Sequence, residues 1–135
     1  MKRERYLFDS CALVWLLQGH KRIKPFIEKN KDHYPDWAVS IDSLREILYK
    51  TKINKLTIRY TYRQMINLLS EYDIEICMFG MKELDTLEKL PFYTQHKDPN
   101  DRHIIATAIT EHRTVVTGDS RFSLYENAGL KFLEV

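Results

Sequence analysis

The sequence predicts an α/β fold in which helices cover both faces of a central, mainly parallel β-sheet of four to five strands. Short continuous apolar runs alternate with segments of helical periodicity along the whole chain, which is typical of parallel strands buried on both faces. The 135 residues suffice for one full core, and no repeat, low-complexity tract or interior linker divides them. We therefore expect residues 1–135 to form a single three-layer α/β/α sandwich.

The first predicted strand ends at an acidic residue that begins a helix. Residues 6–8 form a short apolar run, Asp9 follows directly, and the dense apolar segment after it predicts a buried helix. We expect this helix to end near Gln18, with Gly19 as its C-terminal stop. Either Asp9 or Ser10 could serve as its N-cap, so a capping role alone would explain Asp9.

The second strand and the helix after it are predicted around Ser40. A short basic helix over 21–30 leads to a strand over 37–39, and Ser40 is a good N-cap for the following helix. The main apolar stripe of that helix is predicted to consist of Ile41, Leu44 and Leu48. Glu46 lies roughly opposite this stripe, so periodicity alone predicts an exposed glutamate there.

The middle of the chain predicts a basic connector, a long helix and a third strand. We expect Asn54 at a bend and Thr57 as the cap of a helix that carries Met65 and Leu69. Tyrosines and arginines on this helix could form a nucleic-acid-binding face, although an amphipathic helix with a basic outer side explains them more simply. Residues 74–79 then predict the third strand.

The last third of the chain contains a helix with a clear start signal. A helix over 81–87, stopped by Pro91, precedes it. Asp98 can serve as the N-cap, and Pro99 fits the first helical position. Asp101 stands at the third position, where an acid can reach back to free backbone N–H groups. A capping box alone would therefore explain Asp101.

Two further strands bring acids to one predicted edge of the sheet. Residues 114–117 and 131–135 predict the fourth and fifth strands, and Asp119 comes just after the fourth. Ligand sites in such sheets lie beyond the carboxyl ends of the strands, so Asp9 and Asp119 are predicted neighbours if strands one and four are adjacent. Asp101 shares the apolar stripe of its helix, where a carboxylate is costly unless it is capped, paired or bound to a cation.

Composition limits the class of protein. The net charge of +2 is too small to imply nucleic-acid binding by itself, so any such binding must come from local patches. No apolar run is long enough to span a membrane, and the N-terminal run is broken by Asp9 and lacks a signal cleavage site. Cys11 and Cys77 show no CxxC spacing and are expected to be buried, reduced thiols. We therefore expect a cytoplasmic protein.

The predicted cluster of acids favours a divalent cation. Clustered carboxylates repel one another, and without a cation some of them would take up protons. The histidines lack zinc-ligand spacing, and hard oxygen ligands favour Mg²⁺ or Mn²⁺. A pair of such ions about 4 Å apart can activate water and stabilise the leaving oxygen in phosphodiester hydrolysis. His96, next to the acids, is the histidine that we would test.

Four blocks of the sequence resemble the PIN-domain ribonucleases, in particular the VapC-like toxins of bacterial and archaeal toxin–antitoxin pairs. In order along the chain, they are YLFDSCALVWLL, SIDSLREILYK, LPFYTQHKDPNDRHIIATA and VVTGDSRFSLYENAGLKFLEV. The third block is specific, because histidine, Asp-Pro, Asp-Arg and an alanine-rich helix occur together in one branch of that family. The resemblance implies an α/β/α sandwich and a Mg²⁺- or Mn²⁺-dependent endoribonuclease that leaves a 3′-hydroxyl and a 5′-phosphate.

The resemblance also assigns roles to individual residues. The four acids of the family, which act as catalytic metal ligands directly or through water, fall on Asp9, Glu46, Asp101 and Asp119. This assignment reverses the interpretation of Glu46 from periodicity. Asp98 belongs to the motif as a cap and supporting residue. Asn100 stands where relatives often carry an aromatic residue, a departure that affects a packing contact or a partner surface rather than the acids.

The expected partners follow from the same resemblance. They are an RNA substrate, a cognate antitoxin that covers the acidic pocket, and a second copy of the chain. Candidate contacts for the RNA backbone are Lys50, Lys52, Lys55 and Arg102. A PIN-fold interaction module and an RNA-processing factor outside a toxin–antitoxin pair remain alternatives. Phosphoryl transfer through Asp9 is less favoured, because Cys11 stands where such phosphatases need a second aspartate.

Overall fold

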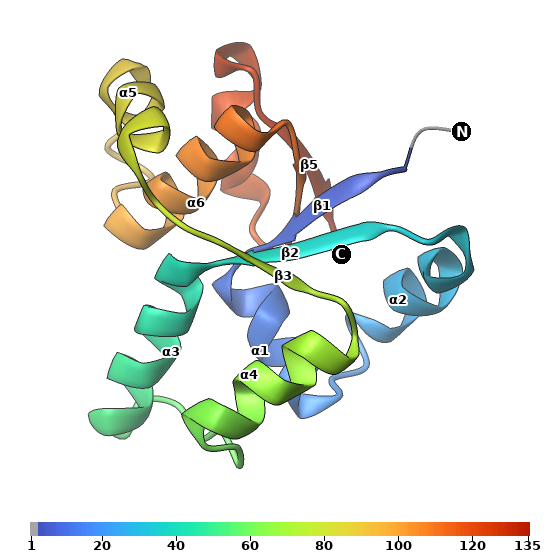
Figure 1. The fold of residues 1–135 in the computed structure, drawn as a ribbon. Coiled ribbons are helices and arrows are strands. Elements are labelled where there is room, and N and C mark those ends of the chain that lie inside the picture. The colour runs from blue at the N-terminus through green and yellow to red at the C-terminus, as the bar shows by residue number, and fades with distance from the viewer. Residues whose placement is uncertain (1–2) are drawn as a thin grey trace.

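The computed structural model describes residues 3–135 and places five parallel strands in one sheet, in the order β3-β2-β1-β4-β5 (Figure 1). The strands are β1 (Arg5–Phe8), β2 (Asp36–Ser40), β3 (Glu75–Cys77), β4 (Thr114–Thr117) and β5 (Lys131–Glu134). The predicted α/β sandwich with a parallel central sheet is therefore confirmed. All five expected strands are present, with ends that differ by at most two residues from the predicted ones.

Helices cover both faces of this sheet. One face carries α1 (Ser10–Gln18), α2 (Lys24–Asn30), α3 (Ile41–Lys52) and α4 (Tyr62–Glu71). The other face carries α5 (Met81–Lys89), α6 (Pro99–Glu111) and the 3₁₀ segment η2 (Ser120–Ala128). A short 3₁₀ turn, η1 (Lys31–His33), leads from α2 to β2. Among residues 3–135, no helix combines the length and apolar character needed to cross a bilayer.

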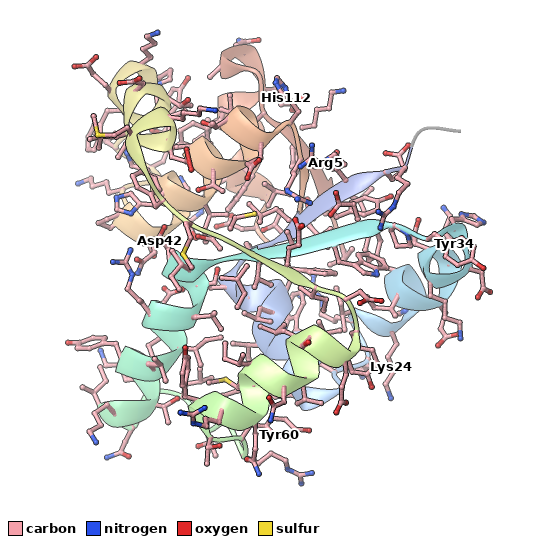
Figure 2. All side chains as sticks on the ribbon, viewed as in Figure 1. Arg5, Lys24, Tyr34, Asp42, Tyr60 and His112 are labelled. Carbon is pink, nitrogen blue, oxygen red and sulfur yellow. The ribbon has the colours of Figure 1, made fainter. Side chains whose placement is uncertain are left out.

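The two cores meet the sheet through alternate residues of the same strands. Phe8 and Val39 pack into the core under α1 and α4, whereas Leu7 and Ala38 pack into the core under α6. All four side chains are fully buried, which is why these strands appear in the sequence as continuous apolar runs. Figure 2 shows side chains filling the space between the sheet and the helices on either side.

The start of α4 differs from its prediction. The helix begins after Thr61 rather than Thr57, so the predicted cap at Thr57 is wrong. Thr61 Oγ1 accepts a hydrogen bond from the Gln64 backbone N–H at 3.2 Å, and Gln64 Oε1 accepts from the Thr61 N–H at 2.9 Å. This reciprocal capping box satisfies two free donors at once and fixes the start of the helix. Asn54 adopts a positive φ of 58° at the bend that was predicted there.

The buried side of α3 also differs from its prediction. Leu48 is 42% exposed, whereas Ile47 is only 1% exposed and packs into the core in its place. Glu46 is 9% exposed, so the exposure predicted from periodicity is wrong. The reason is that α3 lies between α1 and α6 and is covered on two sides, whereas periodicity assumes one buried stripe. Cys77 is buried as expected, but Cys11 is exposed, contrary to its prediction.

Candidate active site

The predicted acids meet where the order of the strands reverses. From β1 the chain proceeds outward to β2 and β3 and then returns to β4 on the other side of β1, so the crevice beyond β1 and β4 is the switch point of the sheet. Asp9 follows β1 directly, and Asp119 follows β4 after Gly118. Thr117 links the two acids, because its Oγ1 donates to Asp9 Oδ2 at 2.6 Å and accepts from the Asp119 N–H at 3.0 Å. The predicted proximity of Asp9 and Asp119 is therefore confirmed.

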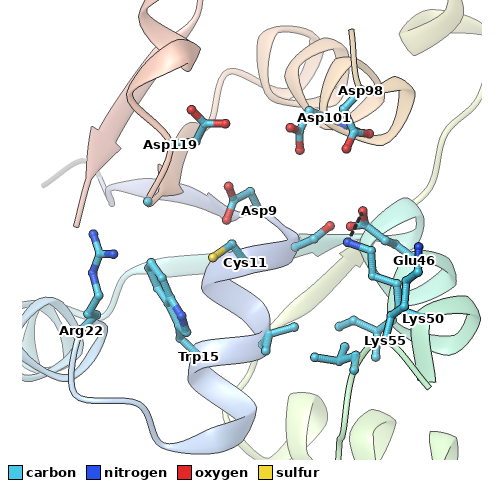
Figure 3. A pocket seen from close by; sticks show the side chains of 15 residues that line it. Asp9, Cys11, Trp15, Arg22, Glu46, Lys50, Lys55, Asp98, Asp101 and Asp119 are labelled. Atoms are coloured by element: carbon cyan, nitrogen blue, oxygen red, sulfur yellow. Dashed lines mark hydrogen bonds and ion pairs between the residues drawn. The ribbon is translucent and has the colours of Figure 1, made fainter. Parts of the chain in front are cut away.

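A pocket of about 490 Å³ opens at this crevice, and all four predicted acids line it (Figure 3). They come from four separate parts of the chain: the junction of β1 with α1, the middle of α3, the first turn of α6 and the loop after β4. The start of α6 thus lies at the same edge of the sheet as the strand ends. Asp98 lines the pocket as a fifth acid.

Asp9 is the most deeply buried acid of the pocket, at 3% exposure. Its Oδ1 accepts from the Ala12 backbone N–H at 2.8 Å, so it caps α1 in addition to lining the pocket. Burial raises its pKa to about 7 despite the hydrogen bonds from Thr117 and Ala12, and the charges of Asp101 and Asp119 raise it further. The two hydrogen bonds therefore fix the orientation of the Asp9 carboxylate, but they do not offset the cost of burying its negative charge.

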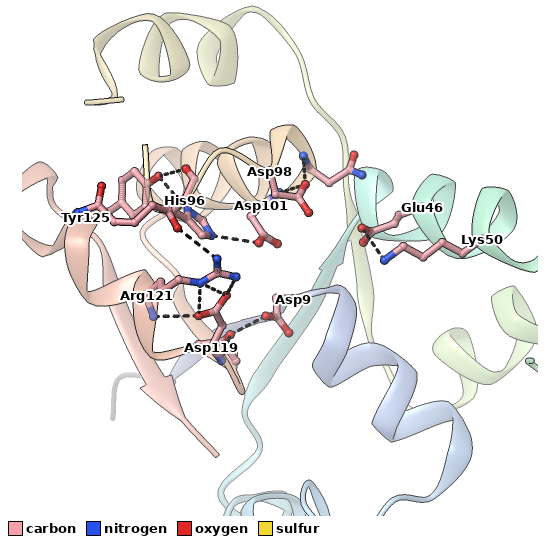
Figure 4. A network of polar contacts seen from close by, with 12 residues as sticks. Asp9, Glu46, Lys50, His96, Asp98, Asp101, Asp119, Arg121 and Tyr125 are labelled. Carbon is pink, nitrogen blue, oxygen red and sulfur yellow. Dashed lines mark hydrogen bonds and ion pairs between the residues drawn. The ribbon is translucent and has the colours of Figure 1, made fainter. Parts of the chain in front are cut away.

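Asp101 is held by a buried histidine (Figure 4). His96 Nε2 lies 3.1 Å from Asp101 Oδ2, and His96 Nδ1 lies 2.9 Å from the Tyr125 hydroxyl. A carboxylate only accepts, so His96 Nε2 donates to Asp101, while the Tyr125 hydroxyl lies beside Nδ1 and donates to the His96 main-chain oxygen at 3.2 Å. Burial, followed by the charge of Asp98, raises the pKa of Asp101 to about 6, although the His96 contact opposes the rise.

Asp98, by contrast, acts as the cap that the sequence predicted. Its Oδ1 accepts from the backbone N–H groups of Asn100 at 2.8 Å and Asp101 at 3.4 Å. Within residues 3–135, the Asp101 carboxylate makes its side-chain hydrogen bond to His96 and not to the start of the helix. The capping-box interpretation of Asp101 is therefore wrong, because Asp98 already satisfies the first donors of α6.

The remaining two acids each contact a basic side chain of the chain itself. Arg121 donates to both oxygens of Asp119, with Nη2 2.7 Å from Oδ2, and this pairing lowers the pKa of Asp119. Lys50 Nζ lies 3.3 Å from Glu46 Oε1, one helical turn further along α3. In both pairs the basic side chain is about half exposed, whereas Glu46 is buried and Asp119 is partly exposed.

A polar bridge fixes the distance between the two helices that supply Glu46 and Asp101. Asp42, fully buried in the first turn of α3, accepts from Ser40 Oγ at 3.2 Å and lies 3.3 Å from His103 Nδ1 on α6. Arg45 also pairs with Asp42. Asp42 is one turn before Glu46, and His103 is two residues after Asp101, so this bridge sets the width of the pocket.

Several basic and aromatic residues of the pocket were not predicted from the sequence. Arg22 and Trp15 line it opposite α3, and Arg121 pairs with Asp119. Of the predicted RNA contacts, Lys50 and Lys55 line the pocket, while Lys52 is not among its lining residues. The guanidinium of Arg102 instead donates to the carbonyl oxygens of Pro91 and Leu90.

Comparison with known families identifies the fold. The sequence pattern of the PIN domain matches residues 6–127. The chain belongs to the PIN-domain family. Among solved structures, this PIN domain is similar to VapBC2 from Rickettsia felis, which was solved bound to a DNA fragment from their promoter. The two are 21% identical with a TM-score of 0.69, over 96% of this chain and 97% of the other.

Two further structures show the same fold. DNA-bound VapBC from Salmonella typhimurium is 12% identical with a TM-score of 0.64, over 97% of this chain and 98% of that one. FitAcB from Neisseria gonorrhoeae is 16% identical with a TM-score of 0.63, over 96% of each chain. A comparison with proteins of curated function found no significant match.

The residues of the pocket fit a hard divalent cation. Its acids offer carboxylate oxygens, the donors that Mg²⁺ and Mn²⁺ prefer, and Cys11 is the one thiol among the described residues that line it. One donor atom each of His96, Asp101 and Asp119 lie within 4.8 Å of one another. The pKa values of Asp9 and Asp101 are raised, so a bound cation would relieve the cost of keeping both ionised at neutral pH. The His96 nitrogen that faces this group carries the hydrogen donated to Asp101, which leaves the carboxylates as the ligands.

Proposed function

We propose that this PIN domain is a Mg²⁺- or Mn²⁺-dependent endoribonuclease and the toxin of a toxin–antitoxin pair. The observation that carries the proposal is the convergence of Asp9, Glu46, Asp101 and Asp119 in one pocket at the switch point of the sheet. PIN domains are in general divalent-metal-dependent nucleases, and the family match spans residues 6–127. The raised pKa of Asp9 gives the metal requirement a physical basis in this chain.

In the proposed mechanism the four acids hold the metal, and the rest of the pocket holds the acids. When bound, the metal supplies activation of water and stabilisation of the leaving oxygen during phosphodiester hydrolysis. Thr117 and the Ala12 N–H orient Asp9, while His96 orients Asp101. Arg121 favours the ionised form of Asp119 before a cation arrives, and Lys50 pairs with Glu46. The products are a 3′-hydroxyl and a 5′-phosphate, as in related nucleases.

The toxin role rests on the similarity to VapBC structures. Two of the similar structures are VapBC assemblies solved with DNA. By analogy, a cognate antitoxin is proposed to cover the acidic pocket of this chain, and two copies of the chain are proposed to pair in the cytoplasm. Co-expression with the protein encoded by the adjacent gene tests this step. A toxin predicts growth arrest when the chain is expressed alone and relief when the two are expressed together, whereas harmless expression alone would contradict it.

Cleavage of RNA by the purified protein tests the enzymatic step. We expect cleavage with Mg²⁺ or Mn²⁺ and none with EDTA. Asp9→Asn and Asp101→Asn should each reduce the rate by at least about 100-fold, because each removes a charged oxygen from the metal site. Asp32→Asn is the matched control, since Asp32 is an exposed acid of η1 away from the pocket. Unchanged cleavage in both pocket variants would remove these acids from the mechanism.

The alternative, a PIN fold that acts only by binding a protein partner, makes a different prediction for metal titration. An interaction module has no requirement for Mg²⁺ at the acid cluster. Isothermal titration with Mn²⁺ should therefore give a binding signal for wild type that Asp101→Asn weakens and Asp32→Asn retains. Absence of metal binding by wild type, together with absence of cleavage, would favour the interaction module.

A further inference from the structure

Basic side chains lie on two opposite sides of the acid cluster. In Figure 3, Arg22 lies beyond Trp15 on one side of the pocket, and Lys50 and Lys55 lie on the other side, with Asp9 between them. A polyanionic strand that crosses the pocket from one of these sides to the other therefore meets a positive charge on each side of the acids. Of these three basic residues, Lys50 and Lys55 were predicted to contact RNA. Arg22 was not, and its side of the pocket has so far been given no role.

The guanidinium of Arg22 is held in place before any ligand binds. Its Cζ lies 4.6 Å from the centroid of the Trp15 ring, and its Nη2 donates to the main-chain oxygen of Val135 at 2.7 Å. Trp15 also stacks on His20, with ring centroids 5.6 Å apart. Since the guanidinium has five donors and Val135 accepts from one nitrogen, the others remain for an anion at the pocket rim.

Trp15 is in turn fixed by the loop that carries Asp119. A Cβ added at Gly118 would lie 2.4 Å from Trp15 Cη2, so only glycine allows the ring to pack this close to the backbone. Trp15, which carries the Arg22 guanidinium, is thus in contact with Gly118, the residue between Thr117 and Asp119. Arg22 and the metal-holding acids consequently form one continuous wall of the pocket.

The opposite side is built by the end of α3 and the turn after it. Lys50 is paired with Glu46, whereas the ammonium of Lys55 has no acid within ion-pair distance among residues 3–135. The backbone N–H of Lys55 donates to the Lys50 carbonyl at 2.9 Å, and Asn54 takes up the positive φ that this tight turn requires. Lys55 is therefore exposed on a short, well-defined turn at the rim.

Building on the proposed nuclease function, we propose that a single RNA strand crosses the pocket between Arg22 and Lys55. Arg22 binds a phosphate on one side of the scissile phosphate, and Lys55 binds a phosphate on the other side. The planar guanidinium suits two oxygens of one phosphate, whereas the ammonium acts as a point charge. These contacts offset the repulsion between the RNA and the acid cluster and place the scissile phosphate over the acids.

Kinetics of charge-removing variants test the two contacts. Arg22→Gln and Lys55→Gln should each raise KM about five-fold with kcat within about two-fold. Each should also reduce the slope of log(kcat/KM) against log[salt] by about 0.7, the value for one lost phosphate contact on a single strand. Arg22→Lys should recover the salt slope, because it keeps the charge. Lys82→Gln, which removes an exposed charge on α5, should change neither quantity. Unchanged KM and salt slope in both pocket variants would overturn the proposal.

Methylphosphonate substitution locates each contact along the RNA. After the cut site has been mapped, one flanking phosphate at a time is replaced by a neutral methylphosphonate. Arg22→Gln should lose its effect with the neutral linkage on one side of the cut, and Lys55→Gln with the neutral linkage on the other side. If both variants respond to the same linkage, or to none, the strand does not cross the pocket as proposed.

Binding measurements separate this inference from the proposed chemistry. Fluorescence anisotropy with the same RNA in the Asp9→Asn background, where cleavage is not expected, should show weaker binding when Arg22→Gln or Lys55→Gln is added. A protein that binds RNA through both residues but never cleaves it would contradict the nuclease proposal alone. A protein that cleaves RNA with unchanged affinity in both variants would contradict the strand path alone.

Discussion

The two ends of the β-sheet both bury charge, but only one of them neutralises it. At the amino end, the guanidinium of Arg113 is 2% exposed and donates to Asp36 Oδ1 at 2.9 Å and Glu75 Oε2 at 2.8 Å. It also reaches the main-chain oxygens of Tyr6 and Asp36 at 3.3 Å. Asp36 and Glu75 are the first residues of β2 and β3, so this cluster ties the strand starts together. Two acids balance the charge of this guanidinium within the chain, although Arg113 Nε is buried without a hydrogen-bond partner.

At the carboxyl end, the balance of charge is reversed. Asp9 is buried and Asp101 is partly buried beside other acids, and their pKa values are raised to about 7 and about 6. Lys50 and Arg121 pair with Glu46 and Asp119, and among the described residues no lysine or arginine pairs with Asp9 or Asp101. Both ends of the sheet contain buried charged groups, so burial alone does not identify a ligand site. The carboxyl end differs because the chain does not supply enough positive charge to balance its acids.

The largest effect is expected at the amino end of the sheet. Arg113→Met should lower the free energy of unfolding by about 3 kcal/mol, because it leaves Asp36 and several main-chain oxygens without their buried donor. Glu75 is 69% exposed and can return to water, which keeps the cost at the lower end of the range for a broken buried pair. Urea denaturation provides the measurement.

Arg5→Met is the matched control for Arg113. Arg5 also pairs with Asp36, at 3.4 Å, but its side chain is 41% exposed, so its loss should cost less than about 1 kcal/mol. Equal costs for the two variants would show that the amino-end cluster is not the closed structural unit described here. Metal affinity should be unchanged in both variants, because neither residue lines the pocket.

A smaller effect of opposite sign is expected at the carboxyl end. Asp9→Asn should stabilise the metal-free protein by about 2 kcal/mol at pH 8. A rise in pKa from 3.8 to about 7 corresponds to about 4 kcal/mol, which relaxation and water penetration reduce. Asparagine keeps the cap on α1 through its one carbonyl oxygen, and its amide N–H group donates to Thr117 Oγ1 instead of accepting from it. Asp36→Asn, by contrast, should destabilise the protein, because it removes a partner of Arg113.

The pH dependence of stability provides a second test of the prediction for Asp9→Asn. The folded protein holds the Asp9 proton more tightly than the unfolded chain, so the stability of metal-free wild type should fall as the pH rises from about 4 to about 7. Asp9→Asn should flatten this part of the profile, and Mg²⁺ should restore stability to wild type at pH 8. A wild-type profile that rises steadily over this range would contradict the charge imbalance at this end.

Local sequence signals located three of the four acids of the candidate site. Asp9 and Asp119 follow strand ends and Asp101 stands in the first turn of a helix, so neighbouring residues were sufficient to place them on these elements, while their meeting at one edge also required the strand order. The burial of Glu46 depends instead on the packing of α6 against α3, and periodicity within α3 contains no information about that contact. Only the family resemblance assigned Glu46 to the pocket.

The other differences between the predicted and the observed structure are also of two kinds: some could be predicted from a local signal, and others depend on packing between distant segments. The start of α4 was predictable, because Thr61 and Gln64 have the spacing of a capping box, a stronger signal than a lone Thr57. No comparable local signal marks Arg22, whose position depends on the connection from α1 to α2 folding back over Trp15. The strand order was likewise fixed by packing of segments far apart in sequence, although alternation of strands and helices was sufficient to predict the fold class.

The smallest effect tests whether the buried support of Asp101 serves the fold or the pocket. Tyr125→Phe removes the hydroxyl 2.9 Å from His96 Nδ1 and keeps the buried ring. The loss of this hydroxyl should cost about 1 kcal/mol of stability, because His96 Nδ1 and the His96 main-chain oxygen are left buried without their partner. Mn²⁺ affinity should also fall about five-fold, since His96 would no longer hold Asp101 in one orientation.

Tyr93→Phe is the matched control for Tyr125. Tyr93 packs edge-on against Tyr125 with ring centroids 5.2 Å apart, but its side chain has no hydrogen bond to Asp101 or His96. The variant should retain both stability and Mn²⁺ affinity. If Tyr125→Phe loses stability with unchanged metal affinity, the contact between Tyr125 and His96 supports only the fold, as the cluster around Arg113 does. If Tyr125→Phe loses metal affinity and Tyr93→Phe does not, the hydrogen bonds from Tyr125 through His96 to Asp101 serve the acid pocket, where buried contacts orient the acids for a cation.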